Sequence, residues 1–502
     1  MSTTINYDSR LCGRGKTTDL HSRINESSEQ YLISSPTLEL NRQQAAAIND
    51  SVQIDSSKTT KGETVGPALL EAISDPKVRN IIATHIGLSG LITAMLEEPF
   101  RTLERHHLVL DEEFTECTKE LTLKVGYEVA YLLLEWMSLA PSEHGANLFD
   151  VTASPDSRLN EIAYEASDCD VLNGSKQLKQ IAKHVTDPLY RTLILEAGKE
   201  ALESAVENKR SASFTLVSCL CPTAFIEFKS VTCLSAFFLE TEFALVSKAL
   251  GVKFQDVSPP VKATSFANSH RLHIHYVTNS KWTSERRNLT DDDKSSNMDK
   301  VAEFIKGQMN SAPFIFNANQ DDRKRLDGWK QSELVVETHG RNDLRHYTKA
   351  AFLGSRNVSP QLGSMLDALG VDRAQIDLAR TLLAGFQLFM RTNLREEAST
   401  ERVDIYCMDK LMVDFMLRVF PQATVDLHDI GLLDRKLDDE RRHNEGGARP
   451  GSGRKSKYPH YFEKRHKRAY QRHARDTENP MTHEDWFSHK ARQSRDPKGL
   501  DT

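Results

Sequence analysis

A glycine-rich turn near the N-terminus has the residue types that bind phosphate groups. The sequence there is Cys-Gly-Arg-Gly-Lys-Thr-Thr, residues 12–18. In such a turn, backbone N–H groups and the N-terminus of the following helix bind phosphate oxygens. A lysine then reaches the terminal phosphates of a nucleotide, and a threonine hydroxyl ligates magnesium. The expected cofactor-binding residues are Gly13, Arg14, Gly15, Lys16, Thr17 and Thr18.

One residue departs from this phosphate-loop pattern. The pattern has a small residue five positions before the glycine that precedes the lysine, and here that position is Arg10. The alternative to a phosphate site is therefore a chance glycine-lysine turn. An acidic segment further along the chain favours the phosphate site.

Two carboxylates follow an apolar run at residues 107–110. Asp111 stands where the strand should end, and Glu112 comes next. Such an aspartate holds the magnesium of a nucleotide from the side opposite the phosphate loop, and a neighbouring glutamate polarises the attacking water. The alternative is a surface acidic cluster that caps a strand. Because both halves occur together, we expect ATP hydrolysis, with Mg²⁺ held by Thr17 and Asp111 and with catalytic roles for Lys16 and Glu112.

The order of short motifs resembles that of superfamily 2 (DEAD/DEAH-like) helicases, especially divergent forms from phages and other mobile elements. Ser35-Pro36-Thr37 is similar to the family's motif Ia, and Thr84-His85 is similar to the element after it. Asp111-Glu112 takes the place of motif II, and Ser235-Ala236 lies in a segment that resembles motif III. The resemblance implies that the first two segments contact the nucleic-acid backbone. It also implies that the Ser-Ala pair couples hydrolysis to strand movement.

Two further motifs lie in the second half of the chain. His339-Gly340-Arg341-Asn342 stands where the family's motif V would be, which implies a coupling role for His339, Gly340 and Asn342. Residues 387–395 resemble motif VI, and on a helix Gln387, Arg391 and Arg395 would share one face. An arginine there can reach the γ-phosphate across a cleft, as an arginine finger. The family separates its two arginines by three positions and this chain by four, so both stay candidates. The alternative is an amphipathic surface helix with solvated arginines.

Short apolar runs alternate with helical patterns along most of the chain, which predicts an α/β fold. Several runs are apolar almost throughout, as in strands buried on both faces of a parallel sheet. With the resemblance, the expected architecture is two RecA-like parallel-sheet lobes. Helical periodicity at 125–137, 176–185 and 189–206 predicts a helical insertion at about 117–210. The expected divisions are a first, ATP-binding lobe at 1–257, a linker at 258–270, a second lobe at 271–428 and a charged tail at 429–502.

The tail is basic, although the chain of 502 residues has a formal net charge of −6. Residues 441–475 carry a net +10, which leaves −16 on the rest. A basic arm on an acidic body favours nucleic-acid binding. Residues 447–455 resemble a minor-groove-binding arm of the AT-hook kind, for which the alternative is a solvated linker. The expected nucleic-acid contacts in the tail are Arg449, Arg454, Lys455 and Lys457.

Bulk properties indicate a soluble protein in a reducing compartment. Mean hydropathy is −0.50, and no apolar run approaches the ~20 residues that span a bilayer. The N-terminus lacks the apolar region of a secretory signal. The 7 cysteines show neither a C-x-x-C pair nor a disulfide-framework spacing. We expect a cytoplasmic location, in a bacterium or a phage-infected host, and no membrane partner.

These features together predict an ATP-dependent helicase or translocase that acts on nucleic acid, with DNA favoured, in replication or repair. Other replication or recombination proteins are its expected partners. One alternative is a phosphate-loop motor that does not separate strands. The other is a DNA-binding replication or regulatory protein with a degenerate nucleotide site. Arg10 favours this last alternative, and so does the lack of room for an adenine-reading segment before residue 12.

Overall fold

The computed structural model of the chain describes residues 4–56, 65–97, 101–112, 114, 117–164, 175–259, 265–309, 312–326, 329, 332–333 and 343–434. The chain divides into two compact units, residues 1–432 and 433–502. Nearly all of the second unit, including the expected contacts Arg449, Arg454, Lys455 and Lys457, lies outside the described residues, as do His339, Gly340 and Asn342. Within the described part, no helix is long and apolar enough to cross a membrane.

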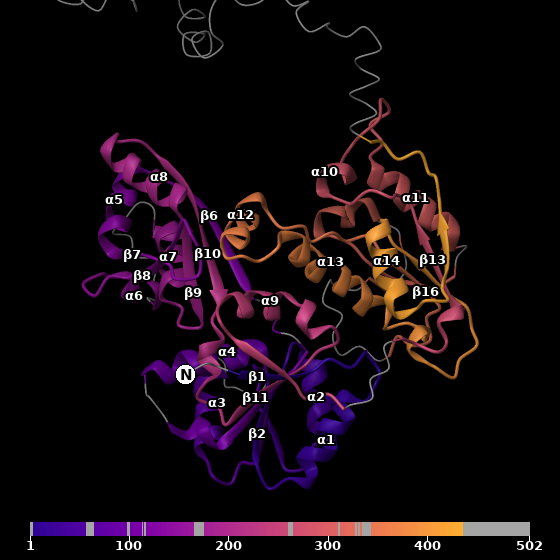
Figure 1. Ribbon diagram of the computed structural model, residues 1–502, viewed down its shortest axis with the longest axis horizontal. Helices are drawn as coiled ribbons and strands as arrows, with labels where there is room; N and C mark the ends of the chain where they lie inside the picture. The colour runs from indigo at the N-terminus through magenta and orange to yellow at the C-terminus, as the bar shows by residue number, and fades with distance from the viewer. Residues whose placement is uncertain are drawn as a thin grey trace, which may run out of the picture. The chain divides into compact units, whose positions relative to one another are not determined.

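The first lobe is built on a seven-stranded sheet in which all neighbouring strands are parallel (Figure 1). The strand order is β12-β1-β11-β5-β2-β4-β3. The strands are β1 (Thr4–Asp8), β2 (Gln30–Ser35), β3 (Ser51–Gln53), β4 (Asn80–Thr84), β5 (His106–Asp111), β11 (Ser230–Leu234) and β12 (Lys253–Asp256). The helices are α1 (Lys16–Glu26), α2 (Leu38–Ala47), α3 (Val65–Ser74), α4 (His85–Glu97) and α9 (Glu242–Ala249), with short 3-10 turns at Arg101–Arg105, Pro222–Phe225 and Phe238–Glu240.

Helices cover both faces of this sheet because its strands alternate two sets of apolar side chains. Leu32 of β2 belongs to a core shared with α3, α4 and α9, whereas the next residue, Ile33, belongs to a core shared with α1. Successive side chains of a strand point to opposite faces, so a continuous apolar run serves two cores at once. The near-continuous apolar strands of the sequence are thereby explained.

The insertion between β5 and β11 is centred on a sheet, which corrects the prediction of a helical insertion. Its five antiparallel strands have the order β6-β10-β9-β8-β7. The run at residues 189–206, expected to be one helix, forms strand β9 and helix α8, because Leu193 and Ile194 are buried in two different cores. The elements are β6 (Thr118–Val125), α5 (Tyr127–Trp136), β7 (Met137–Pro141), β8 (Leu148–Ala153), α6 (Leu159–Tyr164), α7 (Ser175–Thr186), β9 (Tyr190–Leu195), α8 (Glu196–Glu207) and β10 (Ala212–Leu220).

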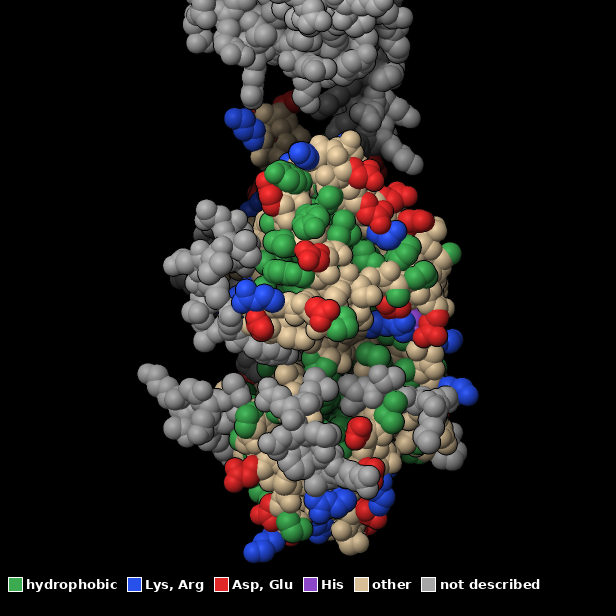
Figure 2. Space-filling view, turned by 90° about the vertical axis from the view of Figure 1, so that its left-hand side faces the viewer, with side chains coloured by type: hydrophobic (Ala, Val, Ile, Leu, Met, Phe, Trp, Pro, Cys, Tyr) green, Lys and Arg blue, Asp and Glu red, His purple; other side chains and the backbone are tan. Residues whose placement is uncertain are grey.

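Part of the molecular surface is apolar. Figure 2 shows hydrophobic side chains interspersed with acidic ones on one face of the molecule. On α5 of the insertion, Tyr127 and Tyr131 are 38% and 56% exposed and border a shallow hollow with Leu132 and Val206.

The second lobe has a six-stranded parallel sheet with the order β15-β14-β16-β17-β13-β18. Helices α13 and α14 pack on one face, and α11 packs on the other. The strands are β13 (Leu272–Tyr276), β14 (Ile315–Asn317), β15 (Ser332–Glu333), β16 (Lys349–Phe352), β17 (Val403–Tyr406) and β18 (Thr424–Leu427). The helices are α10 (Ser284–Arg287), α11 (Asn297–Met309), α12 (Pro360–Ala368), α13 (Arg373–Phe389) and α14 (Lys410–Val419), with 3-10 turns at Ser269–Arg271, Gln320–Leu326 and Asn393–Arg395.

Two apolar clusters join parts of the chain that the sequence treats as separate. One contains Leu11 and Ala236 of the first lobe together with the core of the second lobe around α13 and α14. The other brings Leu193 and Val217 of the insertion sheet against Leu366 of α12. The prediction of two parallel-sheet lobes with an insertion in the first is confirmed. The insertion, in addition, packs on the second lobe.

Candidate nucleotide site

The phosphate loop connects β1 to α1 at the carboxyl end of the first sheet. Gly13 and Gly15 have φ values of +79° and +78°, a region that glycine adopts without steric cost. Gly15 is also the N-cap of α1. The two left-handed turns direct the loop around the N-terminus of α1, where helix N–H groups and the helix dipole favour an anion.

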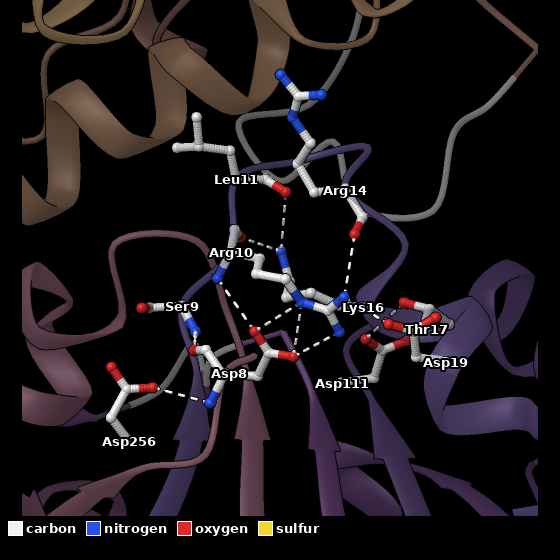
Figure 3. A network of polar contacts seen from close by, with 11 residues as sticks. Asp8, Ser9, Arg10, Leu11, Arg14, Lys16, Thr17, Asp19, Asp111 and Asp256 are labelled. Carbon is white, nitrogen blue, oxygen red and sulfur yellow. Dashed lines mark hydrogen bonds and ion pairs between the residues drawn. The ribbon is translucent and has the colours of Figure 1, made fainter. Parts of the chain in front are cut away.

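The lysine of the loop is bonded to the loop itself. Lys16 Nζ donates to the carbonyl oxygen of Arg10 at 2.6 Å and lies 3.5 Å from that of Leu11 (Figure 3). The ammonium group therefore sits at the mouth of the loop, and it must exchange these carbonyls for phosphate oxygens when a nucleotide binds. Arg14 behaves differently. Its side chain points away from Lys16 (Figure 3), pairs with Glu397 at 2.7 Å and does not line the cavity, so only its backbone is left for the expected cofactor role.

The two expected magnesium ligands are neighbours. Thr17 Oγ1 donates to Asp111 Oδ1 at 3.3 Å, and the second carboxylate oxygen of Asp111 accepts from Gln44. Burial, followed by the charge of Glu112, raises the pKa of Asp111 to about 7. A buried carboxylate beside another carboxylate is stabilised by a cation.

Glu112 has a backbone conformation that is rare for its residue type. Its φ is +76°, and its N–H donates to the carbonyl oxygen of Leu234 at 3.1 Å. A non-glycine residue held there costs on the order of 1–3 kcal/mol, and such residues cluster at functional sites. The turn brings the Glu112 carboxylate to 3.5 Å from Nε2 of Gln387 in the second lobe. The acidic residue and the motif VI glutamine therefore meet across the cleft.

The expected helix through Gln387, Arg391 and Arg395 ends earlier than predicted. Helix α13 ends at Phe389, and Arg395 lies in a 3-10 turn. The chain turns because Thr392 caps that turn and its hydroxyl donates to the carbonyl oxygen of Phe389 at 2.6 Å. Gln387, Arg391 and Arg395 thus reach one cavity because the chain turns after α13, and not because they lie on one face of a helix.

Both arginines nevertheless reach the same cavity. Arg391 is 6% exposed, and its Nε has no hydrogen-bond partner among the described residues. Arg395 lies against the phosphate loop, because a Cβ placed on Gly13 would be 3.3 Å from Arg395 Nε. Burial, followed by the charge of Arg391, lowers the pKa of Arg395. Two guanidinium groups that line one cavity favour a bound anion there.

One cavity of about 430 Å³ collects these groups. Its volume is within the range of small-molecule sites. The catalytic and cofactor-binding candidates that line it are Gly13, Gly15, Lys16, Thr17, Thr18, Asp111, Glu112, Gln387, Arg391 and Arg395.

The residues present fit a magnesium nucleotide. Thr17 and Asp111 offer hydroxyl and carboxylate oxygens, which are the ligands that magnesium prefers. Lys16 and the orphaned Nε of Arg391 offer donors for phosphate oxygens. The first-lobe wall supplies negative charge for the metal, and the second-lobe wall supplies positive charge for the phosphates.

The expected nucleic-acid contacts of the first lobe lie at the starts of α2 and α4, which follow the neighbouring strands β2 and β4. Thr37 caps α2, its hydroxyl accepting from Leu40 N at 3.2 Å, and Thr84 Oγ1 accepts from Gly87 N at 3.0 Å near the start of α4. Pro36 is half-buried. The side chains of Ser35 and His85 are buried, with exposed fractions of 0% and 4%, so they do not face solvent. Binding by these segments stays a prediction, and it would use backbone N–H groups and the half-buried Thr37 and Thr84.

The Ser-Ala pair of the motif III segment lies between the lobes. Ser235 and Ala236 are both buried, and the Ser235 hydroxyl donates to the carbonyl oxygen of Ala236 at 3.3 Å. Ala236 packs into the core of the second lobe. Ala236, two residues after the end of β11, therefore connects the first sheet to the core of the second lobe, and a coupling role for the pair stays a prediction.

The sequence did not reveal three residues of the site. Gln44 bonds Asp111 from α2. Arg345 lines the cavity and pairs with Glu396 at 2.8 Å. Arg10, whose carbonyl oxygen accepts from Lys16, stood out in the sequence only because it departs from the phosphate-loop pattern. Glutamine and arginine on polar helix or loop segments carry no local signal, because such residues are usually solvated.

Comparisons with known proteins return helicase structures. No family model and no curated protein sequence matches the chain, whereas 183 chains of solved structures match. Xpd4 of S. tokodaii is 12% identical, over 85% of this chain and 96% of that one, with a TM-score of 0.42. The DEAD-box helicase Mss116 bound to single-stranded RNA is 11% identical, over 88% and 74%, with a TM-score of 0.33. Dbp5 of S. cerevisiae bound to RNA and ADP BeF3 is 10% identical, over 88% of each chain, with a TM-score of 0.31.

At these identities and TM-scores the likeness to these structures is remote.

Proposed function

We propose that the protein is an ATP-dependent helicase or translocase acting on nucleic acid, with DNA as the favoured substrate. The observation that carries this proposal is the cleft itself. Loop residues of one parallel-sheet lobe and arginines of a second lobe line a single cavity. A site divided between two lobes makes the nucleotide part of the contact between them, so hydrolysis can change their relative position.

Each side chain then has a defined part. The loop amides, Lys16 and the arginines would bind and orient the phosphates. Thr17 and Asp111 would hold a metal ion, whose charge would stabilise the phosphate oxygens. Glu112 accepts a proton from the attacking water, and Gln387, 3.5 Å away, orients that carboxylate. Arg391 stabilises the transition state from the second lobe. Burial of this wall limits access of bulk water.

The test is ATP hydrolysis with and without single-stranded DNA or RNA. We expect stimulation by nucleic acid, and we expect Lys16→Ala and Glu112→Gln to lower kcat/KM at least about 100-fold. Matched controls are Lys77→Ala and Glu71→Gln, which replace exposed residues of the same lobe outside the cavity. Equal hydrolysis by Lys16→Ala and the unmodified protein would overturn the proposal.

Strand displacement on a forked duplex separates a helicase from a motor that does not unwind. Displacement that requires ATP supports the helicase. ATP-driven movement without displacement supports the motor. Stimulation by DNA but not RNA would support the favoured substrate.

A further inference from the structure

The departure at position 10 has a defined place in the structure. Arg10 lies behind the phosphate loop and lines a hollow of about 440 Å³ together with Tyr7 and Phe237. The nucleotide cavity, on the other side of the loop, is lined by Lys16 and its neighbours but not by Arg10. Arg10 therefore does not touch the nucleotide position.

The guanidinium group of Arg10 joins three parts of the first lobe (Figure 3). Its Nε and Nη2 donate to the carboxylate of Asp8, at the end of β1, over 2.7–3.1 Å. Its Nη1 donates to the carboxylate of Asp19, in the first turn of α1, and lies 3.3 Å from the carbonyl oxygen of Arg14. The strand before the loop, the loop and the helix after it are thus held by one side chain.

The backbone of Arg10 completes the arrangement. Its N–H donates to Asp8 Oδ1 at 3.1 Å, and its carbonyl oxygen accepts from Lys16 Nζ at 2.6 Å. Asp8 is 3% exposed, so the ion pair with Arg10 is shielded from water. Charge-assisted hydrogen bonds of this kind are stronger than neutral ones, and a bidentate pair fixes geometry as well.

We infer that Arg10 is a positioning residue that holds the phosphate loop in its binding shape through Asp8, Asp19 and the carbonyl oxygen of Arg14. A small residue in the usual pattern lets the loop fold closely on itself. Here a long side chain passes behind the loop and ties its two ends. This inference rests on the proposed nucleotide site and adds a residue to its machinery.

A phosphate loop held in its binding shape would bind the phosphates equally well in the ground state and in the transition state. Loss of such an interaction raises KM and leaves kcat nearly unchanged. A merely structural defect would instead reduce the folded fraction, which lowers the apparent kcat and leaves KM unchanged. The two kinetic constants therefore separate a positioning role from general destabilisation.

The experiment measures kcat and KM for ATP, and the Kd of a fluorescent ATP analogue, in the full chain. We expect Arg10→Ala to raise KM and Kd about tenfold with kcat within about twofold. Arg10→Lys can pair with one carboxylate but cannot bridge all three groups. Its KM and Kd should therefore lie between those of the unmodified protein and those of Arg10→Ala. Asp19→Asn, whose carboxylate is 54% exposed, should raise KM about two- to threefold and keeps the test open if Arg10→Ala does not fold. Arg158→Ala is the control, because that exposed arginine pairs with Glu161 in the insertion.

The outcomes distinguish this inference from the proposed function. If nucleotide binding is lost in Lys16→Ala but unchanged in Arg10→Ala and Asp19→Asn, the inference is wrong and the proposed function stands. A fall in kcat with constant KM would also overturn it. If the unmodified protein binds no nucleotide, the proposed function fails and the inference fails with it.

Discussion

The two walls of the cleft differ in how their charges are satisfied. On the first-lobe wall, Lys16 is bonded to Arg10, and Asp111 is bonded to Thr17 and Gln44. On the second-lobe wall, Arg345 pairs with Glu396, whereas Arg391 has a buried Nε without a hydrogen-bond partner in the described residues. The first wall is preassembled for phosphates and a metal. On the second wall, a bound anion would balance the buried charge of Arg391.

The largest effect should come from the second wall. We expect Arg391→Ala to lower kcat by on the order of 1000-fold, as for an arginine finger, with a smaller change in KM. Arg391→Lys should not restore activity, because a lysine lacks the planar fork. Steady-state ATPase kinetics measure both constants.

Arg395→Ala serves as the comparison for that result. Because Arg395 lies against Gly13, its loss should change both KM and kcat. The fall in kcat should be smaller than the fall caused by the loss of Arg391. The reverse order would identify Arg395 as the finger.

Two aspartates have pKa values shifted in opposite directions, Asp404 in β17 and Asp111 in the cleft, and they can be compared through the free energy of unfolding. Burial alone would raise the pKa of Asp404, but hydrogen bonds from His275 and Arg402 outweigh it and lower the pKa to about 2. A lowered pKa stabilises the fold above the unfolded value of 3.8 and loses that contribution as pH falls toward 2. We expect Asp404→Asn to lower the free energy of unfolding by about 2 kcal/mol at pH 7 and about 1 kcal/mol at pH 3.

Asp111→Asn should behave in the opposite way. Its carboxylate is buried beside Glu112, so removal of the charge should leave stability unchanged or raise it while magnesium-dependent hydrolysis is lost. Urea unfolding at the two pH values measures both variants. Equal destabilisation by both would break the contrast between the two carboxylates.

Two glycines with the same backbone conformation have different neighbours. A Cβ on Gly13 would lie 3.3 Å from Arg395, whereas one on Gly15 would lie 3.9 Å from Asp19. Left-handed backbone strain should raise the KM for ATP roughly tenfold in both alanine variants. Only Gly13→Ala should also lower kcat, because only it displaces a second-wall arginine. If kcat falls equally in the two variants, the contact between Gly13 and Arg395 does not link the phosphate loop to the second-lobe wall.

The smallest expected effect concerns Arg14, whose side chain points away from the phosphate loop. Arg14 pairs with Glu397 at 2.7 Å, donates to the carbonyl oxygen of Ser265 at 3.2 Å and lies over the ring of Phe266. We expect Glu397→Gln to change the KM for ATP about two- to threefold, since the pair is partly exposed. The change should shrink at high salt. A salt-independent change would assign the effect to packing on Phe266.

The sequence predicted what local chemistry determines. The loop, Asp111-Glu112 and the buried parallel strands follow from residue types at fixed spacing. Gln387, Arg391 and Arg395 line one cavity, but they do not share the face of one helix as expected, because the end of α13 depends on a Thr392 cap that helical periodicity does not show.

The insertion shows where such reasoning stops. Residues 189–206 have helix-forming composition, yet the first part pairs with β10 and β8 and forms strand β9. Pairing partners distant in sequence decide between strand and helix for a short apolar run, and periodicity alone cannot. For the same reason the role of Gln44, which depends on a contact 67 residues away, could not be predicted.

The apolar cluster between the insertion sheet and α12 has a mechanical consequence. The first lobe is joined covalently to the insertion through β6 and β10, the insertion is packed on α12, and α12 belongs to the second lobe. The connection back to the first lobe runs through the chain after β12, so three bodies are linked in a ring. A ring of three bodies has fewer independent motions than a simple hinge between two. In the cycle proposed above, opening and closing of the cleft should therefore cover a limited range, and the insertion should move with the second lobe.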